Sequence, residues 1–170
     1  MPRKLTLLAL AFFVILAACE KDNTEPDVSP TLTPTTVIAV SEAENITLDP
    51  QTLAPGQGTL IVNVSMPIGY KFNNLAPFKA QVAATGSNVI VDSAWTRYEQ
   101  IEPTMPLQIP LTLNEGASIL TLDLTIYWCE AVNESLCFVD ERHITVPITV
   151  DRSARATFAT TEVSLVPPTY

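Results

Sequence analysis

The chain has 170 residues, 47% of them hydrophobic, and a formal net charge of −9 at pH 7. The acidic excess disfavours nucleic acids and anionic lipid surfaces as partners. This length is sufficient for one domain with its own hydrophobic core. The sequence therefore predicts a single acidic domain that binds no nucleic acid.

A short apolar segment opens the chain. The basic pair Arg3-Lys4 precedes an apolar run over 5–18, which ends in Leu16-Ala17-Ala18-Cys19. A membrane-spanning helix takes about 20 apolar residues, so an uncleaved anchor helix fits this run less well than a signal segment does. The segment resembles a bacterial lipoprotein signal with its lipobox.

The resemblance implies cleavage before Cys19, with residues 1–18 as the signal peptide and acyl chains on Cys19. Two or more acyl chains hold a protein stably on a membrane. We therefore expect a lipid-anchored protein of the bacterial cell envelope, outside the cytoplasm, whose membrane partner is reached through Cys19. The sequence does not distinguish the inner from the outer membrane.

Residues 19–36 form the expected linker. They contain Pro26, Pro30 and Pro34 among threonines and acidic residues, with few large apolar side chains. Such a segment buries too little apolar surface to offset its ordering entropy. The sequence predicts a disordered spacer that reaches roughly 50 Å when extended.

Alternating apolar and polar residues dominate the rest of the chain, at 60–66, 78–82, 107–113, 122–128 and 144–150. This period of two is typical of strands with one buried face, and glycine-containing turns separate the segments. We expect an all-β domain over 37–170, an immunoglobulin-like antiparallel β-sandwich of about seven to nine strands. Pro106, Pro110 and Pro147 fall within strand patterns, which predicts edges or bulges there.

Two cysteines remain once Cys19 is set aside. An even count outside the cytoplasm favours one disulfide. Cys129 ends an apolar strand pattern, a short turn follows, and Cys137 begins the next one, so a hairpin would bring the two within bridging range. The bond is open to two interpretations, a structural staple or a disulfide that exchanges with a partner.

The alternation also predicts which way the two cysteines face. With Trp128 directed inward, Cys129 shares the outer face with Tyr127; counting back along the next strand puts Phe138 inward and Cys137 outward, which would leave the bridge accessible. The same count directs Asp140 and Arg142 inward, which is unfavourable for unpaired charges. We therefore expect a bulge or strand break at 139–142.

Acidic residues surround the pair in sequence, namely Glu130, Glu134, Asp140 and Glu141. Nearby negative charge disfavours the thiolate, so the reduced cysteines would be poor nucleophiles. The oxidised pair remains open to attack by the thiol of another protein. This pattern favours a disulfide that is acted upon over an autonomous oxidant.

Residues 66–77 (MPIGYKFNNLAP) resemble a stretch in the C-terminal β-domain of thioredoxin-like proteins that carry NHL repeats, and the likeness continues through 107–124 and 126–147. The cysteine hairpin also resembles the N-terminal domain of the thiol:disulfide interchange protein DsbD. These resemblances imply that Cys129 and Cys137 are a redox pair, with Tyr127, Trp128 and Phe138 as its neighbours. They imply a thioredoxin-like partner acting in trans.

Other candidates are weaker. His143, the only histidine, has no company that would suggest catalysis or metal binding. Asp92, Glu99 and Glu102 lie around two aromatic residues, an arrangement as typical of solvated loops as of sugar chemistry. No metal-ligand spacing, cofactor motif or autonomous catalytic constellation is present. We expect a membrane-tethered lipoprotein whose Cys129–Cys137 bond exchanges with a partner; the alternative is a non-enzymatic structural or binding lipoprotein with the same bond as a staple.

Overall fold

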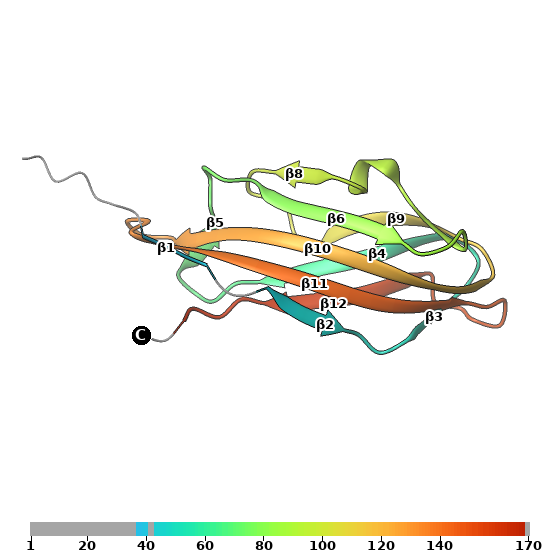
Figure 1. Ribbon diagram of the computed structural model, residues 1–170. Helices are drawn as coiled ribbons and strands as arrows, with labels where there is room; N and C mark the ends of the chain where they lie inside the picture. The colour runs from blue at the N-terminus through green and yellow to red at the C-terminus, as the bar shows by residue number, and fades with distance from the viewer. Residues whose placement is uncertain (1–36, 41–42, 169–170) are drawn as a thin grey trace, which may run out of the picture. The chain divides into compact units, whose positions relative to one another are not determined.

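The computed structural model describes residues 37–40 and 43–168, all of which belong to a compact unit over Pro34–Tyr170. They form two β-sheets packed face to face, which confirms the predicted all-β sandwich (Figure 1). The expected signal peptide over 1–18, Cys19 and the whole of the expected linker up to residue 36 lie outside the described residues. Within the described part, no helix is long and apolar enough to cross a membrane.

The larger sheet is built around a long hairpin and the smaller one around two central strands. The larger sheet contains β1 (Val37–Val40), β2 (Glu44–Thr47), β3 (Gln51–Leu53), β5 (Tyr70–Phe72), β6 (Phe78–Ala84), β8 (Tyr98–Gln100), β10 (Gly116–Glu130) and β11 (Leu136–Val150). The smaller sheet has the order β12 (Phe158–Ser164), β4 (Gly56–Ser65), β9 (Leu107–Leu113) and β7 (Val89–Val91). One 3-10 helix, η1 (Ser93–Trp95), joins β7 to β8.

The outer strands differ from the antiparallel arrangement that we expected throughout. β1, β2 and β3 all pair with β11 in parallel, and β12 pairs with β4 in parallel. The central pairs, β10 with β11 and β4 with β9, are antiparallel. The described residues hold twelve strands rather than seven to nine, because three short strands follow one side of β11 and three more strands have only three residues.

Prolines lie where a neighbouring strand is interrupted. β2 pairs with β11 up to Thr145 and β3 pairs from Ile148, so Pro147 occupies the gap between them. Pro110 lies inside β9 just outside the segment that β7 pairs, which begins at Leu111. Proline has no backbone N–H to donate to a neighbouring strand. In both gaps a strand is paired on one side only, so the missing N–H breaks no hydrogen bond on the other side.

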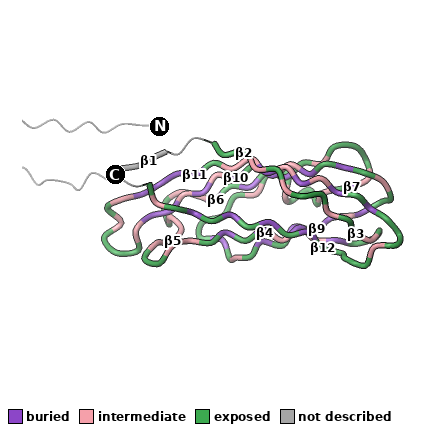
Figure 2. Tube along the Cα trace, turned by 90° about the horizontal axis from the view of Figure 1, so that it is seen from below, coloured by how far each residue is buried: buried purple, intermediate pink, exposed green. Residues whose placement is uncertain are grey.

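The core lies between the two sheets and is built from the alternating residues that the sequence marks (Figure 2). The larger sheet contributes residues such as Phe78, Val82, Leu122, Ile126, Trp128 and Ile144, and the smaller sheet Leu60, Val62, Ile109, Leu111 and Val163, all nearly inaccessible to solvent. Burial of this apolar surface is the dominant favourable term in folding.

The expected bulge at 139–142 is absent, and the prediction was wrong. β10 and β11 pair without a break from Gly116 opposite Val150 to Cys129 opposite Cys137. Asp140 does point into the core, where its carboxylate accepts a hydrogen bond of 2.7 Å from Nε1 of Trp128. Arg142 lies 2.7 Å from the same carboxylate and 3.0 Å from Glu44 on β2. The strand stays regular because the inward charges are paired.

Candidate functional site

The two cysteines lie at the turn end of the β10–β11 hairpin. They lie directly opposite each other in the register, with Cα atoms 4.0 Å apart, and form the expected disulfide. A separation below 7 Å is the requirement for bridging without backbone movement. The predicted pairing of Cys129 with Cys137 is therefore present in the structure.

The strand pair that carries the bond is flanked on both sides. Lys71 on β5 pairs with Cys129, and Ile38 on β1 pairs with Cys137. Cys129 is 1% exposed and Cys137 is 4% exposed. Parity placed both sulfurs on the outer face of the sheet, but the expectation that this face leaves the bridge accessible was wrong, because other parts of the chain cover it.

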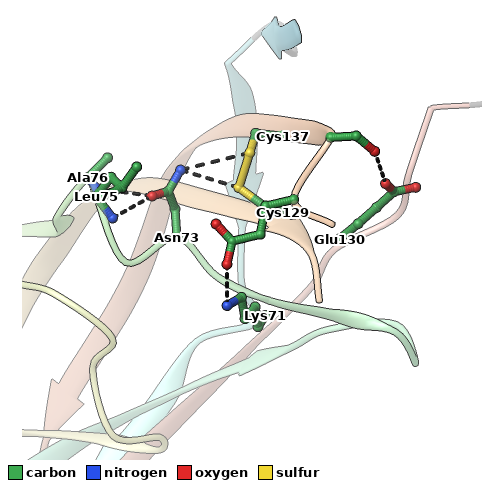
Figure 3. The surroundings of a disulfide bond; sticks show 9 residues. Lys71, Asn73, Leu75, Ala76, Cys129, Glu130 and Cys137 are labelled. Atoms are coloured by element: carbon green, nitrogen blue, oxygen red, sulfur yellow. Dashed lines mark hydrogen bonds and ion pairs between the residues drawn. A yellow bond between two sulfur atoms is a disulfide. The ribbon is translucent and has the colours of Figure 1, made fainter. Parts of the chain in front are cut away.

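Asn73, which follows β5, is one residue that covers the bond (Figure 3). Its Nδ2 lies 3.2 Å from Sγ of Cys129 and 3.9 Å from Sγ of Cys137, and its Oδ1 accepts hydrogen bonds from the backbone N–H groups of Leu75 and Ala76. The backbone N–H of Asn73 donates to the carbonyl oxygen of Tyr127, which fixes the residue beside β10. No pattern in the sequence singles out Asn73, although it lies within the 66–77 stretch.

The acidic surroundings expected from the sequence are partly neutralised. Lys71 forms an ion pair of 2.5 Å with Glu134 in the hairpin turn. The hydrogen bond to Glu134 raises the pKa of Lys71 above its ordinary value. Asp140 is on the other face of the sheet and is paired with Arg142. The negative charge near the sulfurs is therefore smaller than the sequence suggests.

The predicted aromatic neighbours divide between the two faces of the sheet. Trp128 and Phe138 pack in the core, with ring centroids 4.5 Å apart, and Tyr70 joins them at 5.0 Å from Trp128. Tyr127 is half-buried on the face that carries the cysteines. Trp128 and Phe138 thus support the strands from behind, and of these three predicted neighbours only Tyr127 shares the face of the bond.

Three loops around the disulfide each expose one large apolar side chain. Ile68, Leu75 and Val132, which we call the apolar crown, are 103%, 85% and 72% exposed. The loops of Ile68 and Val132 are joined, since the backbone N–H of Ala131 donates to the carbonyl oxygen of Gly69 at 2.7 Å, and the loop of Leu75 is held to β10 by the hydrogen bond from the Asn73 N–H to the Tyr127 carbonyl oxygen. Exposed apolar side chains that form one continuous patch are typical of a binding surface.

A shallow groove adjoins the apolar crown. It has a volume of about 350 Å³ and is lined by Val64, Met66, Tyr70, Lys71, Phe72, Glu102, Pro103 and Met105. Its floor is mainly apolar, with a cation and a carboxylate among its lining residues. Methionines adapt their shape readily, which suits a surface that accommodates a partner.

The weaker candidates do not assemble into a second site. His143 pairs with Asp123 across the strands at 2.5 Å, Asp92 caps η1, and Glu99 lies 3.9 Å from Arg97. Trp95 and Tyr98 stack on each other with centroids 4.4 Å apart. Among the residues the structure describes, no cluster of three or more His, Cys, Asp or Glu side chains could hold a metal ion.

Comparison with known proteins adds no family: no family model matches the sequence, and no curated protein matches it at a significant level.

Proposed function

We propose that this protein is a membrane-tethered, extracytoplasmic lipoprotein whose Cys129–Cys137 disulfide exchanges with a thioredoxin-like partner. The observation that carries the proposal is the disulfide lying among the exposed side chains of the apolar crown, with a side-chain amide directed at its sulfurs. A bond that only stabilised a hairpin would need neither feature. The tether rests on the lipoprotein-like signal ending at Cys19.

The apolar crown supports the proposal that the attacking thiol belongs to another protein. Ile68, Leu75 and Val132 contribute little to the core because they are exposed, so their burial is available to an encounter with another molecule. Interfaces are densest in apolar contacts at their centre and polar at their rim. The crown would supply such a centre near the disulfide, with Glu130 and Glu134 at its margin.

The alternative function is a structural or binding lipoprotein in which the bond is a staple. The burial of both cysteines favours it, because exchange needs a thiolate to reach one sulfur. The reduction potential separates the two proposals. A staple is expected below about −300 mV, whereas an exchanging bond lies higher. Equilibration of the purified domain with redox buffers, followed by mass spectrometry, measures it.

A triple variant tests the docking role of the crown. We expect Ile68→Ser, Leu75→Ser and Val132→Ser together to slow reduction by a reduced thioredoxin about tenfold, since hot-spot contacts are lost. Reduction by dithiothreitol should keep its rate. The matched control carries Ile90→Ser, Ile119→Ser and Phe158→Ser, which alter exposed apolar residues away from the disulfide. Equal slowing by both triple variants would contradict the docking proposal.

The tether has its own test. Mass spectrometry of the full chain expressed in a bacterium should find a mature protein that begins at Cys19 and carries acyl chains. Cys19→Ser should release the protein from the membrane fraction, because the lipid is the proposed anchor. A wild-type protein that begins elsewhere, or carries no lipid, would overturn this part of the proposal.

A further inference from the structure

The side-chain amide of Asn73 has a determined orientation. Oxygen and nitrogen of an asparagine amide are told apart by their partners. Two backbone N–H groups, those of Leu75 and Ala76, donate to one atom of this amide, at 2.6 and 3.2 Å, so that atom must be Oδ1. The NH₂ group is therefore the one that faces the disulfide, and it can only donate (Figure 3).

This donor is unequally shared between the two sulfurs. Nδ2 lies 3.2 Å from Sγ of Cys129 and 3.9 Å from Sγ of Cys137. A neutral disulfide sulfur is a weak acceptor, whereas a thiolate is a strong one, so the hydrogen bond to Cys129 strengthens if negative charge develops there. A donor placed where charge develops lowers the barrier of the step that creates the charge.

We propose that Asn73 directs the incoming thiolate to Cys137 by stabilising Cys129 as the leaving thiolate. The inference rests on the proposed exchange function and goes beyond it by assigning the attacked sulfur and a positioning residue. Rates of exchange depend on which sulfur is attacked and on the stability of the departing thiolate.

The exchange moves two electrons from the partner's dithiol to the Cys129–Cys137 bond. A thiolate of a dithiol protein attacks Sγ of Cys137, a new S–S bond forms, the Cys129–Cys137 bond breaks, and the electron pair stays on Sγ of Cys129. The partner's second thiolate then attacks the partner's own sulfur in the mixed disulfide and releases Cys137 as a thiolate. Two protons bind the two released thiolates. The partner is oxidised to a disulfide, and Cys129 and Cys137 are reduced by two electrons.

Mapping of a mixed disulfide tests the direction of attack without any protein partner. The oxidised domain is treated with glutathione, the freed thiol is alkylated at once, and proteolysis after Glu130 and Glu134 separates the two cysteines. We expect glutathione on Cys137 and the alkyl group on Cys129. Glutathione mainly on Cys129, or equally on both, would overturn the inference while leaving exchange intact. No adduct on either cysteine would overturn both proposals.

Asn73→Asp isolates the donor. The carboxylate keeps an acceptor for the Leu75 and Ala76 amides but has no N–H for the sulfur. We expect adduct formation about tenfold slower, because one charge-assisted hydrogen bond to the departing thiolate is lost, and a weaker preference for Cys137. Asn74→Asp is the matched control, since it adds the same charge at the neighbouring exposed position and should behave as wild type.

A purely structural role for Asn73 would leave the site preference unchanged. The pKa of the Cys129 thiol in the reduced protein is compared in the uncharged Asn73→Ala variant, because the carboxylate of Asn73→Asp would raise that pKa by its charge alone. Loss of the donor raises the pKa, whereas a purely structural role leaves it unchanged, and titration of thiolate absorbance in the Cys137→Ala background reports this value for Cys129 alone. An Asn73→Asp variant with the wild-type site preference, or an Asn73→Ala variant with the wild-type Cys129 pKa, would remove Asn73 from the reaction.

Discussion

Asp140 shows at the scale of one residue why a charged side chain is found inside this sandwich. It is 5% exposed, and its carboxylate is bound by the indole N–H of Trp128 and by the guanidinium of Arg142. Arg142 in turn reaches Glu44 on β2. The network therefore joins both strands of the central hairpin to the adjacent edge strand, and removing one member leaves the others without compensation.

We predict that Asp140→Ala lowers the free energy of unfolding by about 3 kcal/mol, because the largely buried Arg142 loses its nearest counter-ion and Trp128 its acceptor. Urea denaturation of the two proteins measures the difference. Glu141→Ala is the control, since Glu141 is exposed and its loss should change stability by less than about 0.5 kcal/mol. Equal effects of the two substitutions would contradict the network.

Asp151, after the end of β11, gives a prediction for pH. Its carboxylate accepts hydrogen bonds from the hydroxyl and from the backbone N–H of Ser153. These bonds, the hydroxyl's being the stronger cause, hold the pKa of Asp151 below its ordinary value of 3.8. A depressed pKa in the folded state contributes stability above the unfolded pKa, and that contribution is lost as the pH falls through the folded value. We expect the stability advantage over Asp151→Asn to shrink on acidification below about pH 3.8. Urea midpoints across that range measure it; an advantage that stays constant would contradict the assignment.

The inward direction of Asp140 followed from counting along β11, and this part of the sequence reasoning was sound. The bulge inferred from that charge was wrong, because an indole N–H on the neighbouring strand and the guanidinium of Arg142 both pair with the carboxylate. Alternation predicts which face a side chain occupies, but it does not contain the identity of the atoms opposite. The error therefore came from treating the inward charges as unpaired.

At the scale of an element, β12 extends the smaller sheet by running parallel to β4. Its inward residues are Ala159, Thr161 and Val163, all buried against the core. Among the described residues, the hydroxyl of Thr161 is the one fully buried side-chain polar atom with no hydrogen-bond partner. A buried hydroxyl that is unsatisfied costs stability.

Thr161→Val should therefore raise the free energy of unfolding by about 1 kcal/mol, since valine keeps the shape and the β-branch while removing the hydroxyl. Chemical denaturation provides the measurement. Thr160→Val, on the exposed face of the same strand, is the comparison and should have little effect. A destabilised Thr161→Val protein would mean that the hydroxyl has a partner in solution.

The parallel edges could not be predicted from the sequence. Alternation has the same period of two in parallel and antiparallel strands, so β12 reads alike in either direction. The bounds of the short strands depend on their partner β11 and not on their own pattern. For example, β2 and β3 are separate strands because the pairing with β11 is interrupted at Pro147. By contrast, the central strands were predictable because each has an apolar face long enough to alternate several times.

At the scale of the whole molecule, the disulfide acts mainly on the unfolded chain. Closing a short loop removes conformations from the denatured ensemble, and for the separation of 8 residues between the cysteines the chain-entropy estimate is about 2.5 kcal/mol. The remainder of the hairpin is held by its long ladder and by the core. The domain is therefore expected to remain folded when the bond is reduced, as an exchanging protein requires.

We predict that Cys129→Ala with Cys137→Ala lowers the free energy of unfolding by about 2.5 kcal/mol and leaves the fold intact. Circular dichroism checks the fold, and guanidinium denaturation measures the loss. Wild-type protein in a strong reductant is the control and should unfold at nearly the same midpoint. Loss of the folded state in the double variant would show that the bond is indispensable to the domain, which would favour the staple.

Only part of the candidate site was accessible to sequence reasoning. The cysteine pair lies within one hairpin, so spacing and strand pattern were sufficient to bring its two members together. Asn73 reaches Cys129 across 56 positions of chain through a loop whose path no local pattern specifies. The crown residues were equally hidden, because a single exposed Ile, Leu or Val in a turn has no periodicity to mark it.

The parallel pairing of β1 with β11 determines at which end of the sandwich the first described strand begins. β1 begins opposite Leu136, next to Cys137, and β12 ends beside Ser65 of β4, so the first and last strands of the described part both have their outer ends at the disulfide end of the sandwich (Figure 1). The proposed lipid anchor would therefore attach the sandwich by the end that carries the disulfide. The length of the linker would then limit the size of a partner that fits between this end and the membrane.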